Sequence, residues 1–363
     1  MKKKFFLILM VIGLFCVGCV KNNTSDVLKN LTKKINNLKS YQLGGKLEVV
    51  NNDDVFNYDV EVSFKDKDYY RVSLKNLANS HEQIILKNDD GVYVVTPSLN
   101  KSFKFQSDWP NNNSQVYLLK SIISDIESDQ EAKIIEENGD YIITSKVNFP
   151  NNPNLVNQKV TVDENLLIKK VEIQNSDGIS LMTFTIDSIN YKPVLDESYF
   201  EINSIINETN NGNNGNNTNN SDKTTNDNTN NTTNGNNTEN NNQNSTQTTA
   251  TIEDIVYPLY IPTGTVLENE EKVSKTDGER VILTFGGDKP FTLVEETTAK
   301  EDEFTIVPTY GEPFLLIDTV AALSENSINW VSNGIEYYIV SDVMNQNELI
   351  EIAKSVNVVS VLK

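Results

Sequence analysis

The chain has 363 residues, which allows two or three domains, and it carries a formal net charge of −20. This acidity excludes electrostatic binding to nucleic acid or to an anionic membrane surface. The single histidine cannot supply a histidine-based metal cluster, and the only two cysteines lie near the N-terminus.

The N-terminal residues have the pattern of a secretory signal. The basic stretch Lys2–Lys4 precedes an apolar run, Phe5–Phe15, and a cysteine with polar residues after it follows. The end of the signal resembles a bacterial lipobox, with small Gly18 directly before Cys19 and with Cys16 where leucine is usual. The resemblance implies that Cys19 is acylated on sulfur.

We therefore predict that residues 1–18 are a lipoprotein signal peptide and that Cys19 is the lipid attachment site. The alternative is an uncleaved signal anchor, but the apolar run is shorter than the roughly 20 residues that span a bilayer. Two acyl chains suffice for stable anchoring on the extracytoplasmic face of the membrane. Cleavage and acylation would leave no free thiol, which excludes a disulfide, a thiolate metal site and a cysteine nucleophile.

Two helices and many strands are expected before residue 203. Apolar side chains recur at helical spacing from Val27 to Leu38, with Ser25 as a possible cap, and a second helix is expected to start near Asn113 or Ser114. Elsewhere apolar and polar residues alternate, which is typical of half-buried strands. The expected strands cover 58–64, 70–74, 83–86, 92–96, 103–105, a short one at 134, 141–144, 160–162, 171–173 and 181–189.

Tight turns join several of these strands, as at Asn88–Gly91 and Asp177–Gly178. Consecutive hairpins with few helices indicate a large antiparallel sheet. We predict an α+β domain over residues 19–203, with a curved or partly closed antiparallel sheet and helices on one face.

The segment 204–251 consists mainly of Asn, Thr, Gly and Ser and has almost no apolar side chains. It cannot bury enough surface to offset chain entropy, so we predict a disordered linker. Residues 252–363 again show hairpin turns, at Gly286–Asp288 and Asn333–Gly334, and a closing helical pattern. We predict a small α+β domain there.

No set of residues has the spacing of a catalytic site. There is no glycine-rich phosphate loop and no nucleophile elbow. His81 lies in a polar connection and is expected to be a solvated loop residue, while Asp89 and Asp90 fit a turn better than a calcium site. Carboxylate-only glycosidase chemistry stays open, because two acids can meet in space. We predict no cofactor, no metal and no enzymatic activity.

Aromatic side chains gather around the central strands and the second expected helix. The simple interpretation is sheet core; the alternative is an apolar groove that takes an acyl chain or a segment of a partner. The candidate residues for such a groove are Tyr70, Phe103, Phe105, Trp109 and Tyr117.

Two blocks of sequence carry a family resemblance. Residues Gln83–Pro97, Leu99–Pro110 and Ser114–Leu118 form the first block, and Asp277–Thr284 forms the second. They resemble the sporulation and germination lipoproteins of spore-forming Firmicutes, the YdcC-like and GerS-like proteins. The likeness covers nearly the whole chain except the Asn-rich linker.

The resemblance implies a fold similar to LolA, LolB and RseB: an unclosed, strongly curved antiparallel sheet with helices on its concave face. Arg71 is the only candidate in this domain for a carrier's lid-contacting arginine, and an exposed strand position is the simpler interpretation. The leading hypothesis is a membrane-anchored, non-catalytic protein that binds an envelope protein, such as a cortex-modifying peptidoglycan amidase. The alternatives are a lipid or lipoprotein carrier and, after it, an enzyme of cell-wall glycan.

Overall fold

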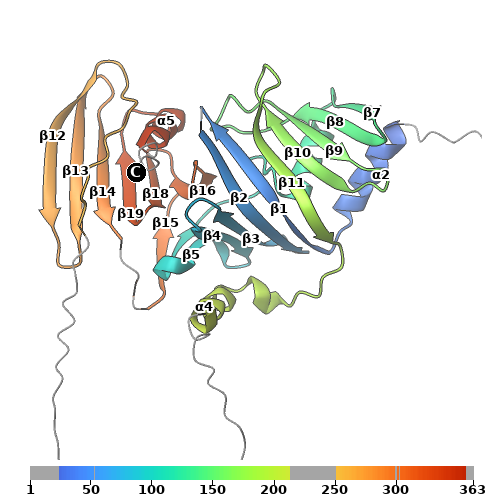
Figure 1. Cartoon of the computed structure of the whole chain (residues 1–363), viewed down its shortest axis with the longest axis horizontal. Helices are drawn as coiled ribbons and strands as arrows, with labels where there is room; N and C mark the ends of the chain where they lie inside the picture. The colour runs from blue at the N-terminus through green and yellow to red at the C-terminus, as the bar shows by residue number, and fades with distance from the viewer. Residues whose placement is uncertain (1–23, 53, 213–250, 299–300, 302, 357–363) are drawn as a thin grey trace, which may run out of the picture. The chain divides into compact units, whose positions relative to one another are not determined.

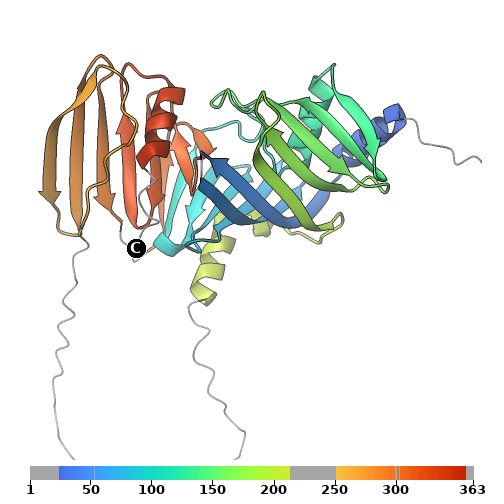
Figure 2. The same cartoon turned by 45° about the horizontal axis from the view of Figure 1, so that its top comes forward.

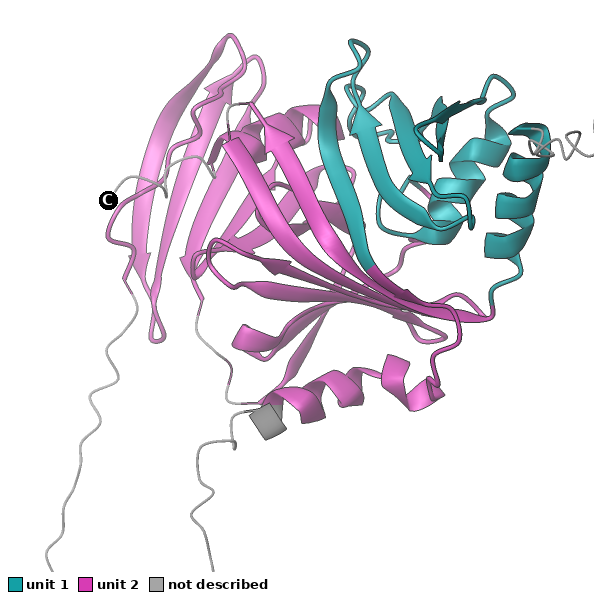
Figure 3. Ribbon diagram, turned by 45° about the vertical axis from the view of Figure 1, so that its right-hand side comes forward, with its two compact units in different colours: residues 1–38, 113–187 teal, residues 39–112, 188–363 magenta. Residues whose placement is uncertain are grey.

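The computed structural model describes residues 24–52, 54–212, 251–298, 301 and 303–356. The expected signal peptide, Cys19 and positions 213–250 of the expected linker lie outside the described residues. The chain divides into two compact units, one of residues 1–38 and 113–187 and the other of residues 39–112 and 188–363 (Figure 3).

The first unit packs two helices against antiparallel strands. Helix α2 (Thr24–Asn36) contacts α3 (Leu119–Ser128) and strand β7 (Lys133–Glu137), and α3 contacts β8 (Asp140–Lys146). The strand order runs from β7 and β8 through β9 (Asn157–Val162) and β10 (Ile168–Gln174) to β11 (Ser180–Asn190), whose last residues belong to the second unit.

Helix α2 buries its expected apolar stripe, at Val27, Leu31 and Ile35. Helix α3 begins at Leu119, about one turn later than the sequence indicated. Ser114 is the reason: its backbone N–H donates to the Asn148 carbonyl, and its Oγ accepts from the Asn148 N–H, each at 2.7 Å. These two hydrogen bonds to Asn148 hold the start of the expected helix in a non-helical conformation.

The second unit contains a row of seven strands. Their order is β1 (Ser40–Asn51), β2 (Asp54–Lys65), β3 (Tyr69–Asn76), β4 (Glu82–Asn88), β5 (Gly91–Thr96), β6 (Lys101–Phe105) and β15 (Thr305–Thr309), with a short 3₁₀ helix η1 (Pro97–Leu99) between β5 and β6. Neighbours pair antiparallel except β6 and β15, which are parallel. The long strands β1 and β2 bend along their length (Figure 1).

The C-terminal residues form a second, open sheet in the same unit. Its order is β12 (Thr265–Ser274), β13 (Glu279–Gly287), β14 (Phe291–Thr297), β19 (Ile335–Val340), β18 (Ser327–Ser332), β17 (Val320–Leu323) and β16 (Glu312–Leu315). Helix α5 (Gln346–Val356) lies against β18 and β19 (Figure 2). Leu349, Ile352 and Ala353, all fully buried, pack into the sheet's core.

A further helix lies where the sequence indicated the start of the linker. The 3₁₀ helix η2 (Glu197–Phe200) leads into α4 (Ile202–Gly212), so residues 204–212 are helical. The physical reason is the apolar pair Ile202 and Ile205, which packs against the sheet before the Asn-rich composition takes over.

The fold is α+β, with curved antiparallel sheets whose strand orders are open rows, as expected. Within the ranges that the structure covers, every helix is too short or too polar to cross a membrane.

Candidate functional site

Three of the aromatic candidates lie on one side of the β1 to β6 strands, the side that carries Phe64, Tyr70 and Phe105, which we call the aromatic face. The Tyr70 ring lies 5.0 Å from that of Phe64 and meets that of Trp109 edge-on at 5.8 Å. Tyr70, Phe105 and Trp109 are each at most 2% exposed. Burial accordingly raises the pKa of the Tyr70 hydroxyl. These three residues are core side chains of the second unit.

Phe103 differs from them, since it is half-buried on β6. It lies opposite Val94 of β5 and Val307 of β15, and the Lys101 ammonium is 5.0 Å from its ring centroid. This geometry is a cation–π contact. Phe103 therefore lies at the edge of the aromatic face, where β15 of the C-terminal residues pairs with β6.

Tyr117 belongs to the first unit, where it is buried and donates its hydroxyl to Gln115 Oε1 at 2.9 Å. Burial raises its pKa. The structure thus brings Tyr70, Phe105 and Trp109 onto one face, leaves Phe103 at its edge and holds Tyr117 in a different unit.

One end of the aromatic face is occupied by residues 316–320, which we call the docking segment. Tyr58 donates its hydroxyl to the Ile317 carbonyl, and Asn76 Nδ2 donates to the Asp318 carbonyl at 3.3 Å. Tyr58 and Asn76 lie directly opposite each other on β2 and β3, and each is 2% exposed. Because both side chains bind main-chain carbonyls, they fix the path of the segment in a buried environment.

Gln83 of β4 makes the most complete contact with the docking segment. Its Oε1 accepts from the Val320 N–H at 2.6 Å and lies 2.9 Å from Thr319 Oγ1, while its Nε2 donates to the Val320 carbonyl at 3.2 Å. Gln83 is 4% exposed. The sequence analysis missed this residue; the signal was an amide at the inward position of an otherwise apolar strand.

The docking segment also brings together two titratable groups. Asp318 is half-buried and accepts a hydrogen bond from Ser332 Oγ at 2.6 Å, and its partial burial raises the pKa of its carboxyl. Burial lowers the pKa of His81, which the charge of Asp318 partly counteracts. His81 lies in the connection between β3 and β4, as expected. It is half-buried rather than fully solvated, and within the described residues its Nε2 is buried without a hydrogen-bond partner.

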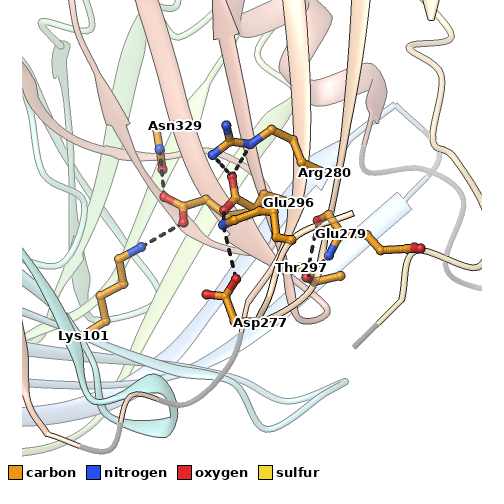
Figure 4. A network of polar contacts seen from close by, with 9 residues as sticks. Lys101, Asp277, Glu279, Arg280, Glu296, Thr297 and Asn329 are labelled. Carbon is orange, nitrogen blue, oxygen red and sulfur yellow. Dashed lines mark hydrogen bonds and ion pairs between the residues drawn. The ribbon is translucent and has the colours of Figure 1, made fainter. Parts of the chain in front are cut away.

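Strand β15 leaves the C-terminal sheet and pairs with β6, in register from Thr305 opposite Lys101 to Thr309 opposite Phe105. Beside this pairing, Lys101 Nζ lies 2.8 Å from Glu336 Oε2, and Glu336 Oε1 accepts from Asn329 Nδ2 at 3.0 Å (Figure 4). The Lys101–Glu336 ion pair is about four-fifths buried on both sides and joins β6 to β19.

The opposite side of β3 to β5 is covered by η2 and α4, and we call it the α4 face. Its side chains form an apolar cluster with Phe200 and Ile205, which are 0% and 1% exposed. Asn88 Nδ2 adds a hydrogen bond to the Phe200 carbonyl at 2.9 Å. The residues of β3 to β5 in this cluster are Tyr69, Ile84, Leu86, Tyr93 and Val95.

A buried arginine lies within the α4 face. Arg71 of β3 makes a two-pronged contact with Glu208 of α4, at 3.0 Å (Nη1–Oε1) and 2.5 Å (Nη2–Oε2), and its guanidinium lies 4.6 Å from the Tyr199 ring centroid. Burial alone lowers the pKa of Arg71, but the Glu208 hydrogen bond and the nearby Glu82 charge outweigh it, so the pKa is raised. Only 9% of the Arg71 side chain is exposed, so the expectation of an exposed strand position is wrong.

Carboxylates gather in one hollow of the first unit, of about 410 Å³, which Asp125, Asp129 and Glu131 help to line. Burial raises the pKa of Asp125 to about 6, but Ser114 Oγ donates to it at 2.9 Å. Asp129 accepts the backbone N–H groups of Glu131 and Lys146. Asp125 and Asp129 thus hold neighbouring loop segments together. Across the described ranges, His, Cys, Asp and Glu side chains form no group suited to a metal ion.

No protein-family model matches the sequence. The chain is 31% identical over 353 residues to the sporulation protein YdcC of Bacillus subtilis (strain 168), and the match covers 96% of each chain. The chain belongs to the YdcC family of sporulation proteins.

Solved structures resemble this YdcC-family chain only distantly. MucB in complex with MucA(peri) has 14% identity and a TM-score of 0.30, covering 92% of this chain and 98% of its own. A LolA superfamily protein from Nitrosomonas europaea has 11% identity and a TM-score of 0.30, covering 50% and 98%. A chain of the CwlD amidase–GerS lipoprotein complex from Clostridioides difficile has 18% identity and a TM-score of 0.22, covering 47% and 98%. Scores this low establish no shared activity or partner for the YdcC-family chain.

Proposed function

We propose that the chain is a non-catalytic lipoprotein of sporulation, anchored through Cys19 to the extracytoplasmic face of a membrane, and that it acts by binding an envelope protein. The observation that carries the sporulation role is the match to YdcC over 96% of both chains. The N-terminal lipobox pattern supports the anchor, and the partner that the family resemblance implies is a cortex-modifying peptidoglycan amidase.

Protein binding is favoured over lipid carriage by the packing of the aromatic face. An acyl-chain carrier needs an apolar cavity lined by such residues, of roughly several hundred Å³. Tyr70, Phe105 and Trp109 are instead buried, and Tyr70 and Trp109 pack against each other. The docking segment occupies one end of the same face and binds Gln83 there. Rings already buried in the core are not available to line a carrier's groove.

The test is affinity purification of the tagged full chain from sporulating cells, with protein and lipid mass spectrometry on the same eluate. A stoichiometric envelope protein, with no lipid beyond the acyl groups on Cys19, supports the proposal. A co-eluting lipid that is lost in the Phe103→Ala variant, but kept in the exposed control variant Leu77→Ala, supports the carrier instead.

The anchor is tested separately with Cys19→Ser. We expect this variant to leave the membrane fraction and to lose incorporation of labelled palmitate. A Cys19→Ser protein that stays membrane-bound would contradict the lipid anchor and support a signal anchor. Normal sporulation in cells that lack the chain would contradict the proposed role.

A further inference from the structure

Helix α4 is held on its face of the sheet by few contacts. Of its apolar side chains whose placement is described, only Ile205 is fully buried, while Ile202 and Ile206 are half-buried. The helix has 11 residues, and isolated helices shorter than about 12–15 residues are marginal in water. Its helical structure therefore depends on the α4 face rather than on its own sequence.

Most of the α4 face is formed by residues outside α4. Its apolar residues belong to three paired strands, and Phe200 of η2 adds to them. Tyr199 of η2 lies over the Arg71 guanidinium, so the arginine is positioned by the sheet and by η2. What α4 adds is a carboxylate, from Glu208, whose side chain is 55% exposed.

The asymmetry of this ion pair defines what the face recognises. Arg71 is almost fully buried, so a helix that docks beside it binds better when it supplies a counter-charge. The planar fork of arginine selects a carboxylate in bidentate geometry. Any helix that replaced α4 would therefore need apolar side chains with the spacing of Ile202 and Ile205 and an acidic residue one turn further on, as in Glu208.

We propose that the α4 face is a helix-docking site, occupied in this chain by α4, and that the protein partner exchanges with α4 by presenting an amphipathic helix with this apolar and acidic pattern. The proposal deepens the proposed function, since it names the surface and the kind of segment through which the partner binds. A tethered helix competes at high effective concentration, so the partner's helix must bind more tightly than α4 does.

The first experiment measures docking directly, by fluorescence anisotropy of a labelled peptide with the sequence of residues 196–212, titrated with the full chain. In Glu208→Arg the helix of the chain itself is repelled by Arg71, so we expect the native peptide to bind about tenfold or more tightly than it binds the wild type. In Arg71→Glu/Glu208→Arg we expect no binding of the native peptide. The nearby Glu82 charge and the lost Tyr199 contact lower its thermal stability below that of the wild type, so circular dichroism first confirms that it is folded. Equal binding to all three proteins overturns the proposal.

The second experiment separates docking from mere support of the fold, in sporulating cells whose only copy of the chain is the variant. The double charge reversal keeps the Arg–Glu pair but presents a glutamate to the partner. We expect it to be folded and present at the level of the wild type, and yet to fail in sporulation. Full rescue of sporulation, which a purely structural ion pair predicts, overturns the proposal.

The chain supplies a matched control in its other arginine. Arg280 Nη2 lies 2.5 Å from Glu296 Oε2 on the C-terminal sheet, the same separation as in the Arg71 pair. Cells that carry Arg280→Glu/Glu296→Arg are expected to sporulate normally.

Two further outcomes separate the proposals. If no variant, including deletion of the chain, affects sporulation, the proposed function fails, while the peptide titration still decides whether the α4 face is a docking site. If the Glu208→Arg protein forms dimers that the peptide dissociates, the helix that binds the α4 face belongs to a second copy of this chain. The inference of a different partner is then overturned.

Discussion

The docking segment and helix α4 are held on opposite faces of the same strands, by different chemistry. The docking segment is bound through neutral side chains of the sheet, above all Gln83, that reach main-chain atoms in a buried setting. Helix α4 is bound through one charged pair, Arg71–Glu208, of which the glutamate is half exposed. Main-chain contacts of the first kind hold a fixed path, whereas a charged pair with one exposed partner is open to substitution by another carboxylate.

The largest effect is expected at Gln83. Gln83→Leu removes three hydrogen-bonding contacts and leaves the buried N–H and carbonyl of Val320 without a partner. Each unsatisfied buried group costs about 1–3 kcal/mol, so we expect the free energy of unfolding of the second unit to fall by about 4 kcal/mol, measured by urea denaturation. Gln106→Leu, at an exposed site, is the control. A loss below about 1 kcal/mol at Gln83 would show that the docking segment is not the firmer of the two contacts.

Glu295 makes a buried contact with main-chain atoms, as Gln83 does, but its side chain can be titrated. Glu295 of β14 is 0% exposed and accepts the Val256 N–H with both oxygens, at 3.0 and 3.3 Å, thereby holding the residues that precede β12. Burial raises the pKa of Glu295 to about 7. The folded state therefore binds the proton more tightly than the unfolded chain does. Its contribution to stability is complete below the unfolded pKa, near 4.5, and is lost as the pH rises through about 7.

We expect this titration to amount to about 3 kcal/mol between the two limits. The measurement is the Tm of the wild type minus that of Glu295→Gln, which cannot ionise, and this difference should fall as the pH rises from acid to neutral. Glu271→Gln, on the exposed strand β12, is the surface control. A difference independent of pH would mean that Glu295 stays charged in the folded protein.

At α4 the expected effect is smaller and local. Glu208→Gln keeps hydrogen-bonding oxygen but loses the charge that Arg71 requires, so we expect the stability of α4 to fall by about 1 kcal/mol. Hydrogen exchange of the α4 amides should become about fivefold faster, with no change in the docking segment. Glu201→Gln, exposed just before the helix, serves as the reference. Acceleration in both segments would show that the two contacts are coupled.

The smallest effect is expected for Lys101, whose ion pair with Glu336 supports the docking of β15. Glu336 keeps its hydrogen bond from Asn329 and about a fifth of its surface in solvent, so Lys101→Met is expected to lower the free energy of unfolding by only about 1 kcal/mol. The loss should shrink at high salt. Urea denaturation at two ionic strengths measures it, with exposed Lys75→Met beside it. A loss of unfolding free energy as large as that of Gln83→Leu would show that this ion pair stabilises the fold as much as the buried main-chain contacts do.

Local patterns in the sequence predicted the strands from β2 to β11, because alternating burial leaves a direct trace in residue order. They did not reveal β1, where Gly44 and Gly45 interrupt an alternation that Tyr41, Leu43 and Leu47 otherwise show. They also hid α4, because two isoleucines were outweighed by the asparagine-rich composition around them.

The candidate site was predicted only in part. The structure brings three of the five candidate aromatic residues, Tyr70, Phe105 and Trp109, onto one face. Local sequence does not distinguish rings that line a groove from rings that fill a core. The partners of Gln83 and Arg71 lie 237 and 137 residues further along the chain. No local pattern contains such a pairing, since it is decided by how distant strands and helices pack.

The parallel pairing of β15 with β6 has a consequence for the order of folding. Thr305 lies opposite Lys101, so this contact closes a loop of about 200 residues, and contacts of such separation are slow to form. During synthesis the β6 edge and the far end of the aromatic face are complete long before the residues that cover them exist. Before residues 305–320 are synthesised, the edge of β6 is unpaired and the side chain of Gln83, which is buried in the final fold, is exposed to solvent. At this stage aggregation or chaperone binding competes with the pairing of β15 and β6.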